Sequence, residues 1–145
     1  DAGRIDIWSQ VPCSSGIIYC IGAQNSVGPG ARMRFEGSTF LAANDLTLFT
    51  DGCPPNQFGL YYYGSTAIQL PFGDGWRCAG GGFYRLGLVS TNTGTATRSV
   101  DLTSAQEQQI VAGSSWGFQF LYRDPNGPLG SGFNASDGLW ARFCP

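Results

Sequence analysis

The chain has 145 residues and a formal net charge of −2, and only 12% of its residues are charged, about half the usual share. It contains no histidine and no lysine, whereas glycine occurs 22 times and cysteine five times. This composition argues against nucleic-acid binding, which needs clustered positive charge, and against chemistry that uses an imidazole or an amine. The length suits one domain, and no apolar run approaches the roughly 20 residues of a membrane span.

The first 16 residues differ in pattern from the rest of the chain. Polar and apolar residues alternate around Ile5, Ile7 and Trp8, and a turn-rich stretch follows. This segment is interpreted either as the first strand of the fold or as an arm that pairs with another subunit by strand addition. In the second case Ile5, Ile7 and Trp8 are the expected subunit contacts. Residues 17–145 are expected to form one β-sandwich domain.

From residue 17 onward, short alternating runs separated by Gly, Pro, Asn and Asp predict an all-β, antiparallel sandwich or jelly roll. The clearest strand places Trp116, Phe118, Phe120 and Tyr122 on one face. Further strands are predicted near residues 17–21, 32–35, 46–49, 58–63, 67–72, 84–89, 96–102 and 138–143. Turns are predicted at 28–30, 54–56, 73–75, 80–82 and 124–127.

One short helix is predicted within residues 103–111. Thr103 or Ser104 is expected to cap it, and its length is expected not to exceed two turns.

The carboxylates do not predict an enzyme. Asp45, Asp74, Asp124 and Asp137 stand in turn-like sequence, where Asp usually caps backbone groups. A serine or cysteine nucleophile would lack a histidine base, and the G-x-S-x-G motif is absent. We therefore expect no catalytic residue, no cofactor and no metal. A calcium site made of Asp124, Asn126 and Asp137 is kept as an alternative, because oxygen ligands suit this cation.

Aromatic residues raise the alternative of glycan binding. Trp76 and Arg77 are the candidate pair, since they are predicted to lie in a glycine-flanked loop at residues 73–77. Other aromatic candidates are Trp8, Trp140, Tyr61 and Tyr63. Most aromatic residues in a sandwich belong to its core or rim, which is the competing interpretation for each of them. Asn134-Ala135-Ser136 matches an N-glycosylation acceptor.

Several short motifs, spread in order over residues 19–140, carry a resemblance to other proteins. They are Tyr19-Cys20, Asn25-Ser26, Ala42-Ala43-Asn44-Asp45-Leu46, Pro54-Pro55-Asn56-Gln57-Phe58-Gly59, Arg77-Cys78, Gly80-Gly81, Gly113-Ser114-Ser115-Trp116, Phe118-Gln119, Tyr122-Arg123-Asp124 and Phe133 to Gly138. With them the chain resembles a family of uncharacterised β-domains near the C-termini of large secreted or surface bacterial proteins. The resemblance implies an extracellular β-domain and no catalytic activity.

Two disulfides are expected, and the resemblance implies the first. The resembling domains have a Tyr-Cys pair near the start and one cysteine in mid-chain, which implies a bond between Cys20 and Cys78. A second bond between Cys13 and Cys144 would tie the N-terminal segment to the last strand. Cys53 would then be unpaired, bonded to another molecule, or a buried free thiol.

The function expected from the sequence is that of a non-enzymatic extracellular structural protein. In this hypothesis the chain is secreted or displayed on a bacterial cell surface and forms a homo-oligomer or homopolymer, such as a filament or matrix, by N-terminal strand addition. The alternatives are a monomeric carbohydrate-binding module that recognises glycans, and an anchoring domain without a ligand.

Overall fold

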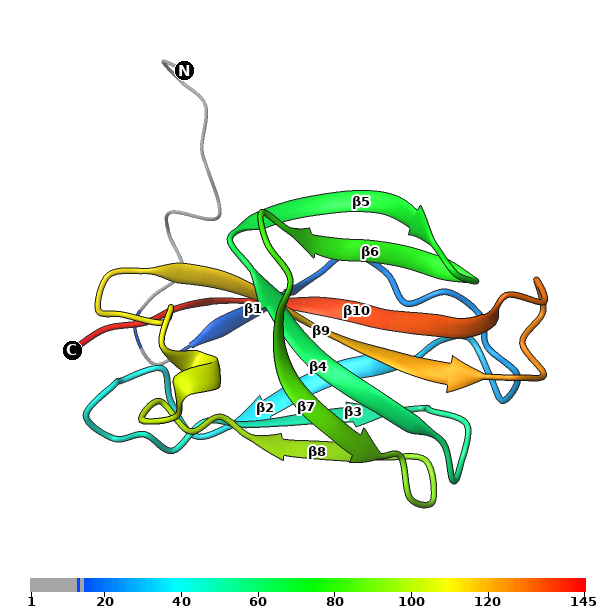
Figure 1. Ribbon diagram of the computed structural model, residues 1–145, viewed down its shortest axis with the longest axis horizontal. Helices are drawn as coiled ribbons and strands as arrows, with labels where there is room; N and C mark the ends of the chain where they lie inside the picture. The colour runs from blue at the N-terminus through cyan, green and yellow to red at the C-terminus, as the bar shows by residue number, and fades with distance from the viewer. Residues whose placement is uncertain (1–12, 14) are drawn as a thin grey trace, which may run out of the picture.

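The computed structural model describes residues 13 and 15–145, which form three antiparallel sheets (Figure 1). The first sheet has five strands in the order β1-β10-β9-β4-β7, the second has the order β2-β3-β8, and β5 and β6 form a separate hairpin. The all-β antiparallel prediction is thereby confirmed. Of the predicted N-terminal arm, Ile5, Ile7 and Trp8 lie outside the described residues.

The elements have the following bounds: β1 Gly16–Tyr19, β2 Arg32–Glu36, β3 Thr47–Asp51, β4 Phe58–Gly64, β5 Thr66–Phe72, β6 Gly75–Gly80, β7 Tyr84–Ser90, β8 Ala96–Ser99, the 3-10 helix η2 Ala105–Glu107, β9 Ser115–Asp124 and β10 Gly132–Arg142. The helix lies inside the predicted range 103–111, and Ser104 caps it by accepting a hydrogen bond from the Gln106 amide. No helix of the described part of the chain is long and apolar enough to cross a bilayer.

The main core lies between the five-stranded and three-stranded sheets. Because side chains alternate along a strand, the predicted face of β9 places Phe118 and Phe120 inside, and β4 adds Tyr61 and Tyr63. Leu48 on β3 contributes to the same core from the opposite sheet. The buried tyrosine hydroxyls keep partners: that of Tyr61 lies 2.6 Å from the Thr50 hydroxyl, and that of Tyr63 donates to the Gln106 carbonyl.

The sandwich is joined along one side by Asp137, which stands in a bulge of β10 between Ala135 and Gly138. Its carboxylate accepts a hydrogen bond of 2.6 Å from the amide of Met33 on β2, and its own amide donates to the Ala31 carbonyl. A carboxylate that occupies an edge amide prevents that edge from pairing with another strand. Burial raises the pKa of Asp137 to about 6, although the Met33 amide and Arg32 both lower it.

The β5–β6 hairpin covers part of the other face of the five-stranded sheet, which we call the outer face (Figure 1). Gln119 of β9 is fully buried beneath the hairpin. Its side-chain amide donates to the carbonyls of Trp76 and Ser136, and its side-chain oxygen accepts from the Tyr62 hydroxyl and the Cys78 amide. One side chain therefore links β9 to β4, β6 and β10.

Two predictions about strands need correction. Trp76 and Arg77 belong to strand β6 and not to a loop. The last strand begins at Gly132 and not near residue 138. The first half of β10 is rich in polar residues, and these are buried with partners: Asn134 donates to backbone carbonyls, and the Ser136 hydroxyl accepts from the Phe120 amide.

Both expected disulfides are present. Cys20 bonds to Cys78, which fixes the end of β1 to the hairpin, with a Cα–Cα distance of 6.2 Å. Cys13 bonds to Cys144, with a Cα–Cα distance of 5.7 Å, so the N-terminal segment is attached beside the end of β10. In the chain-entropy model, each loop of this length stabilises the fold by about 4–5 kcal/mol.

Replacing Gln119 by Ala is expected to lower the free energy of unfolding by about 3 kcal/mol, because buried partners of its side chain are left without a hydrogen bond. Urea denaturation of the oxidised protein measures this. Gln69→Ala, at an exposed position of β5, is the matched control and should change stability by less than about 0.5 kcal/mol. Equal effects of the two substitutions would contradict the role given to Gln119.

Asp137→Asn is expected to stabilise the protein at pH 7. Since the folded-state pKa of Asp137 is about 6 and lies above its ordinary value, the native state binds the extra proton, and stability falls as pH rises from about 4 to 6. Asn keeps an oxygen acceptor for the Met33 amide and carries no charge, so the gain at pH 7 should be about 3 kcal/mol. Calorimetry of both proteins from pH 4 to 7 measures the difference, which should vanish near pH 4. A constant difference across this range would contradict the assignment.

Candidate functional site

The part of the outer face that the hairpin leaves open carries a shallow apolar groove with a volume of about 360 Å³. We call it the outer groove. It crosses four neighbouring strands, and the side chains that define it are Phe58 and Leu60 of β4, Leu88 of β7, Leu121 and Arg123 of β9, and Phe133 of β10.

Strand register brings these residues together from distant parts of the sequence. Leu60 is paired with Leu88 on one side and with Leu121 on the other, so three leucines form one row across β7, β4 and β9. Arg123 and Phe133 are paired in the adjacent row. Cross-strand partners lie about 5 Å apart, which makes the rows one continuous surface.

The apolar side chains of the groove are unusually exposed to solvent. Phe58 and Leu88 have exposed fractions of 62% and 70%. An antiparallel sheet with one solvated face normally carries polar residues there. Large exposed apolar patches on soluble proteins mark interaction sites, so the groove is the candidate functional site.

The charged side chains at the groove are basic. Arg123 lines the groove and is exposed. Phe133, the cross-strand partner of Arg123, packs edge-on against Phe72 at the turn of the hairpin, with ring centroids 5.2 Å apart. Arg85 stands on β7 paired with Tyr62, and its guanidinium lies 5.6 Å from the ring centroid of Phe83. No carboxylate lines the groove in the described residues.

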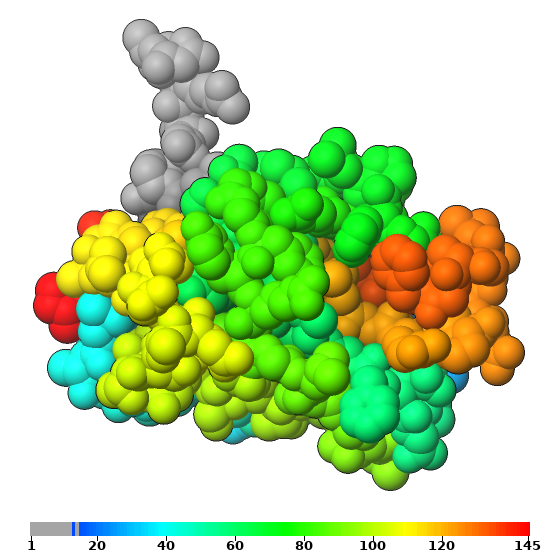
Figure 2. All heavy atoms as spheres, viewed as in Figure 1, coloured from blue at the N-terminus to red at the C-terminus, as the bar shows by residue number. Residues whose placement is uncertain are grey.

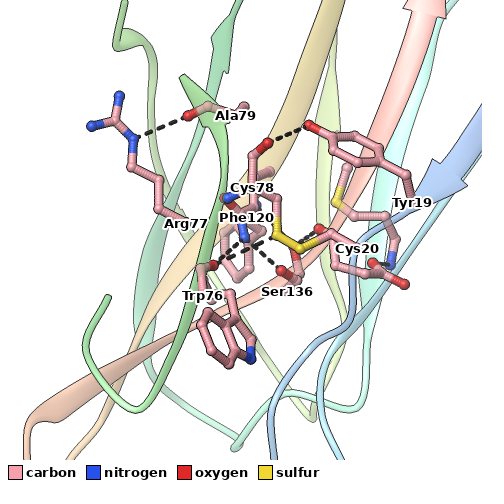
Figure 3. Close-up of a disulfide and its surroundings, with 12 residues drawn as sticks. Tyr19, Cys20, Trp76, Arg77, Cys78, Ala79, Phe120 and Ser136 are labelled. Atoms are coloured by element: carbon pink, nitrogen blue, oxygen red, sulfur yellow. Dashed lines mark hydrogen bonds between the residues drawn. A yellow bond between two sulfur atoms is a disulfide. The ribbon is translucent and has the colours of Figure 1, made fainter. Parts of the chain in front are cut away.

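The residue pair predicted for glycan binding, Trp76 and Arg77, belongs to the hairpin and does not line the groove. Figure 3 shows Trp76 and Arg77 on β6, next to the Cys20–Cys78 bond. The Arg77 side chain donates to the carbonyls of Ala79 and Gly82, and Trp76 is partly buried. The other aromatic candidates that the structure describes, Tyr61, Tyr63 and Trp140, are buried.

The structure does not bring the proposed calcium ligands together. Asp124 ends β9 and accepts hydrogen bonds from the amide and the hydroxyl of Ser26, whereas Asp137 binds the Met33 amide farther along β10. Asn126 is exposed in the turn that follows Asp124. Among the described residues, no three His, Cys, Asp or Glu side chains form a potential metal-binding group.

The remaining predicted carboxylates and the glycosylation motif also have structural contacts. Asp74 accepts from the amide and hydroxyl of Ser131, and Asp45 accepts from those of Ser38. Asn134 is fully buried and donates to the Gln24 carbonyl, so the folded chain does not present this side chain for glycosylation.

Cys53 is a buried free thiol with an exposed fraction of 3%. Burial, with a smaller contribution from the Asp51 carboxylate, raises its pKa to about 12. The thiolate is the form that attacks disulfides, and it is suppressed here. Of the three alternatives for Cys53, the structure favours the buried thiol over an intermolecular bond.

Comparison of the chain with protein-family models, with curated proteins and with solved structures finds no match. The observations on the chain itself therefore define its class, which is an all-β module with two disulfides and an open apolar groove.

Sequence reasoning missed the outer groove, although one signal was present. In the stretch 58–63 both alternating sets of residues are apolar or aromatic apart from Gly59. A strand of this kind needs a cover on both faces. Which residues of other strands join Phe58 and Leu60 depends on strand register.

Iodoacetamide is expected to leave Cys53 unmodified in the native oxidised protein at pH 8 and to modify it once in urea, because the thiol is buried and protonated. Intact-mass spectrometry counts the added groups. Cys53→Ala, which has no free thiol, should gain none in either condition. Rapid labelling of the native wild-type protein would contradict the buried assignment.

Proposed function

We propose that this chain is a non-enzymatic extracellular structural protein whose copies assemble with one another, and that the outer groove is an assembly surface. The observation that carries the proposal is the exposure of Phe58 and Leu88 within a continuous apolar surface. Full burial of side chains of this size stabilises an association by roughly 1.5–3 kcal/mol each.

The surroundings of the groove suit a structural role. Gln119 and the Cys20–Cys78 bond fix the hairpin beside the groove, so binding does not require this part of the fold to become ordered first. Two disulfides favour an oxidising compartment, and with the resemblance to domains of secreted bacterial proteins they support a secreted or cell-surface location.

A carbohydrate-binding module is the alternative proposal. It has less support, because Arg77 is engaged by backbone carbonyls and Trp76 is partly buried. The outer groove also lacks the amide and carboxylate side chains that usually orient a sugar, since Arg123 is its only charged lining residue in the described part.

The wild-type protein is expected to show a weight-average mass that rises with concentration, and Leu88→Ser should weaken this association at least tenfold, because it removes an apolar contact of about 1.4 kcal/mol or more. Size-exclusion chromatography with light scattering, with and without reductant, measures the mass.

Leu129→Ser is the matched control, since Leu129 is 75% exposed and does not line the groove. A loss of association in this variant equal to that in Leu88→Ser would remove the groove from the proposal. A monomeric wild-type protein at every concentration would contradict self-assembly.

A further inference from the structure

We infer that the outer groove receives the N-terminal segment of a second copy, with Ile5 and Ile7 as the inserted side chains. The inference rests on the proposed function and assigns the two surfaces that meet. It follows from the shape of the groove, from the length of chain that precedes Cys13 and from the place where Cys13 is attached.

The pattern of the segment fits the groove. In an extended chain, Ile5 and Ile7 project from the same side about 7 Å apart. The row of Leu88, Leu60 and Leu121 covers two strand spacings, about 10 Å. An extended segment lying across the strands can therefore place both isoleucines on this row.

The segment of the same molecule is too short to fill its own groove. Cys13 is bonded to Cys144, beyond the last residue of β10, whereas Phe133 stands at the start of β10. The nearest leucine of the row, Leu121, stands six residues along β9 from Ser115, the partner of Arg142. Cys144 lies two residues farther, so about 26 Å of strand separates the attachment point from the row. Ile7 precedes Cys13 by six residues, which reach at most about 22 Å when fully extended.

The hairpin adds a second obstacle. It lies over β9 and β10 on the outer face, in the region of Gln119 and Cys78 between the attachment point and the groove. Figure 2 shows the red C-terminal end of the chain and the orange turn before β10 at opposite ends of the molecule, with the green hairpin projecting between them. The N-terminal segment of a neighbouring copy is restricted neither by its distance from the groove nor by the hairpin.

Charge favours the same pairing. The segment holds two carboxylates, Asp1 and Asp6, and one cation, Arg4. The groove is lined by Arg123, and Arg85 stands on the same face of β7 as Leu88. Opposite charges at the rim of an interface favour encounter and orientation.

The position of the two surfaces determines the kind of assembly. The attachment point and the groove lie near opposite ends of β10, so each copy uses two different surfaces to contact two neighbours. Contacts of this head-to-tail kind give rings when the rotation closes and open filaments when it does not.

The test mixes two full-length variants. Ile5→Ser/Ile7→Ser keeps the groove but lacks the two isoleucines that would enter it. Phe58→Ser/Leu88→Ser keeps these isoleucines but lacks the apolar groove. Light scattering measures the mass of each variant alone and of an equimolar mixture, with Leu129→Ser as a surface control. Near-ultraviolet circular dichroism and Tm confirm that every variant is folded.

The expected result is that each variant alone is monomeric and that the mixture forms particles of two chains that grow no further. A monomeric mixture, or an Ile5→Ser/Ile7→Ser variant that assembles as the wild-type protein does, would overturn the inference. Assembly of the Ile5→Ser/Ile7→Ser variant would still be compatible with self-assembly through the groove. A wild-type protein that stays monomeric removes self-assembly itself, which separates the two failures.

Discussion

The outer face of the five-stranded sheet carries more apolar surface than the two-stranded hairpin covers. Gln119 and the Cys20–Cys78 bond hold the hairpin over one part of this face. The remaining part contains Leu60, Leu88 and the other groove residues, and it stays in contact with water. Because water contact of apolar side chains is unfavourable, the position of the hairpin creates the tendency to bind another surface.

The buried polar groups explain why the hairpin has one position. Tyr62 of β4 and Gln119 of β9 bond the backbone of β6, and Gln119 also donates to the Ser136 carbonyl of β10. Apolar contacts alone would tolerate sliding of the hairpin along the sheet. A buried polar network is satisfied in one arrangement only, so it defines where the covered part of the face ends and the groove begins.

Much of the fold could be predicted from alternation. The pattern of Trp116 to Tyr122 identified β9 and its buried face, because each inward position carries a large apolar side chain. The start of β10 escaped prediction, since Asn134 and Ser136 read as turn residues until their partners are known. Strand β6 escaped because glycines flank it closely. The groove depends on register between strands that are far apart in sequence, and a single sequence does not reveal register.

The Cys13–Cys144 bond also determines how the fold would respond to tension. A force applied to the N-terminal segment passes through the sulfur atoms to the residue beyond β10, a strand paired on both sides by β1 and β9. Without that bond, the same pull would act first on β1, a short edge strand that could be peeled from the sheet one residue at a time. With the bond in place, the load acts on β10, whose release from the sheet breaks hydrogen bonds to both β1 and β9.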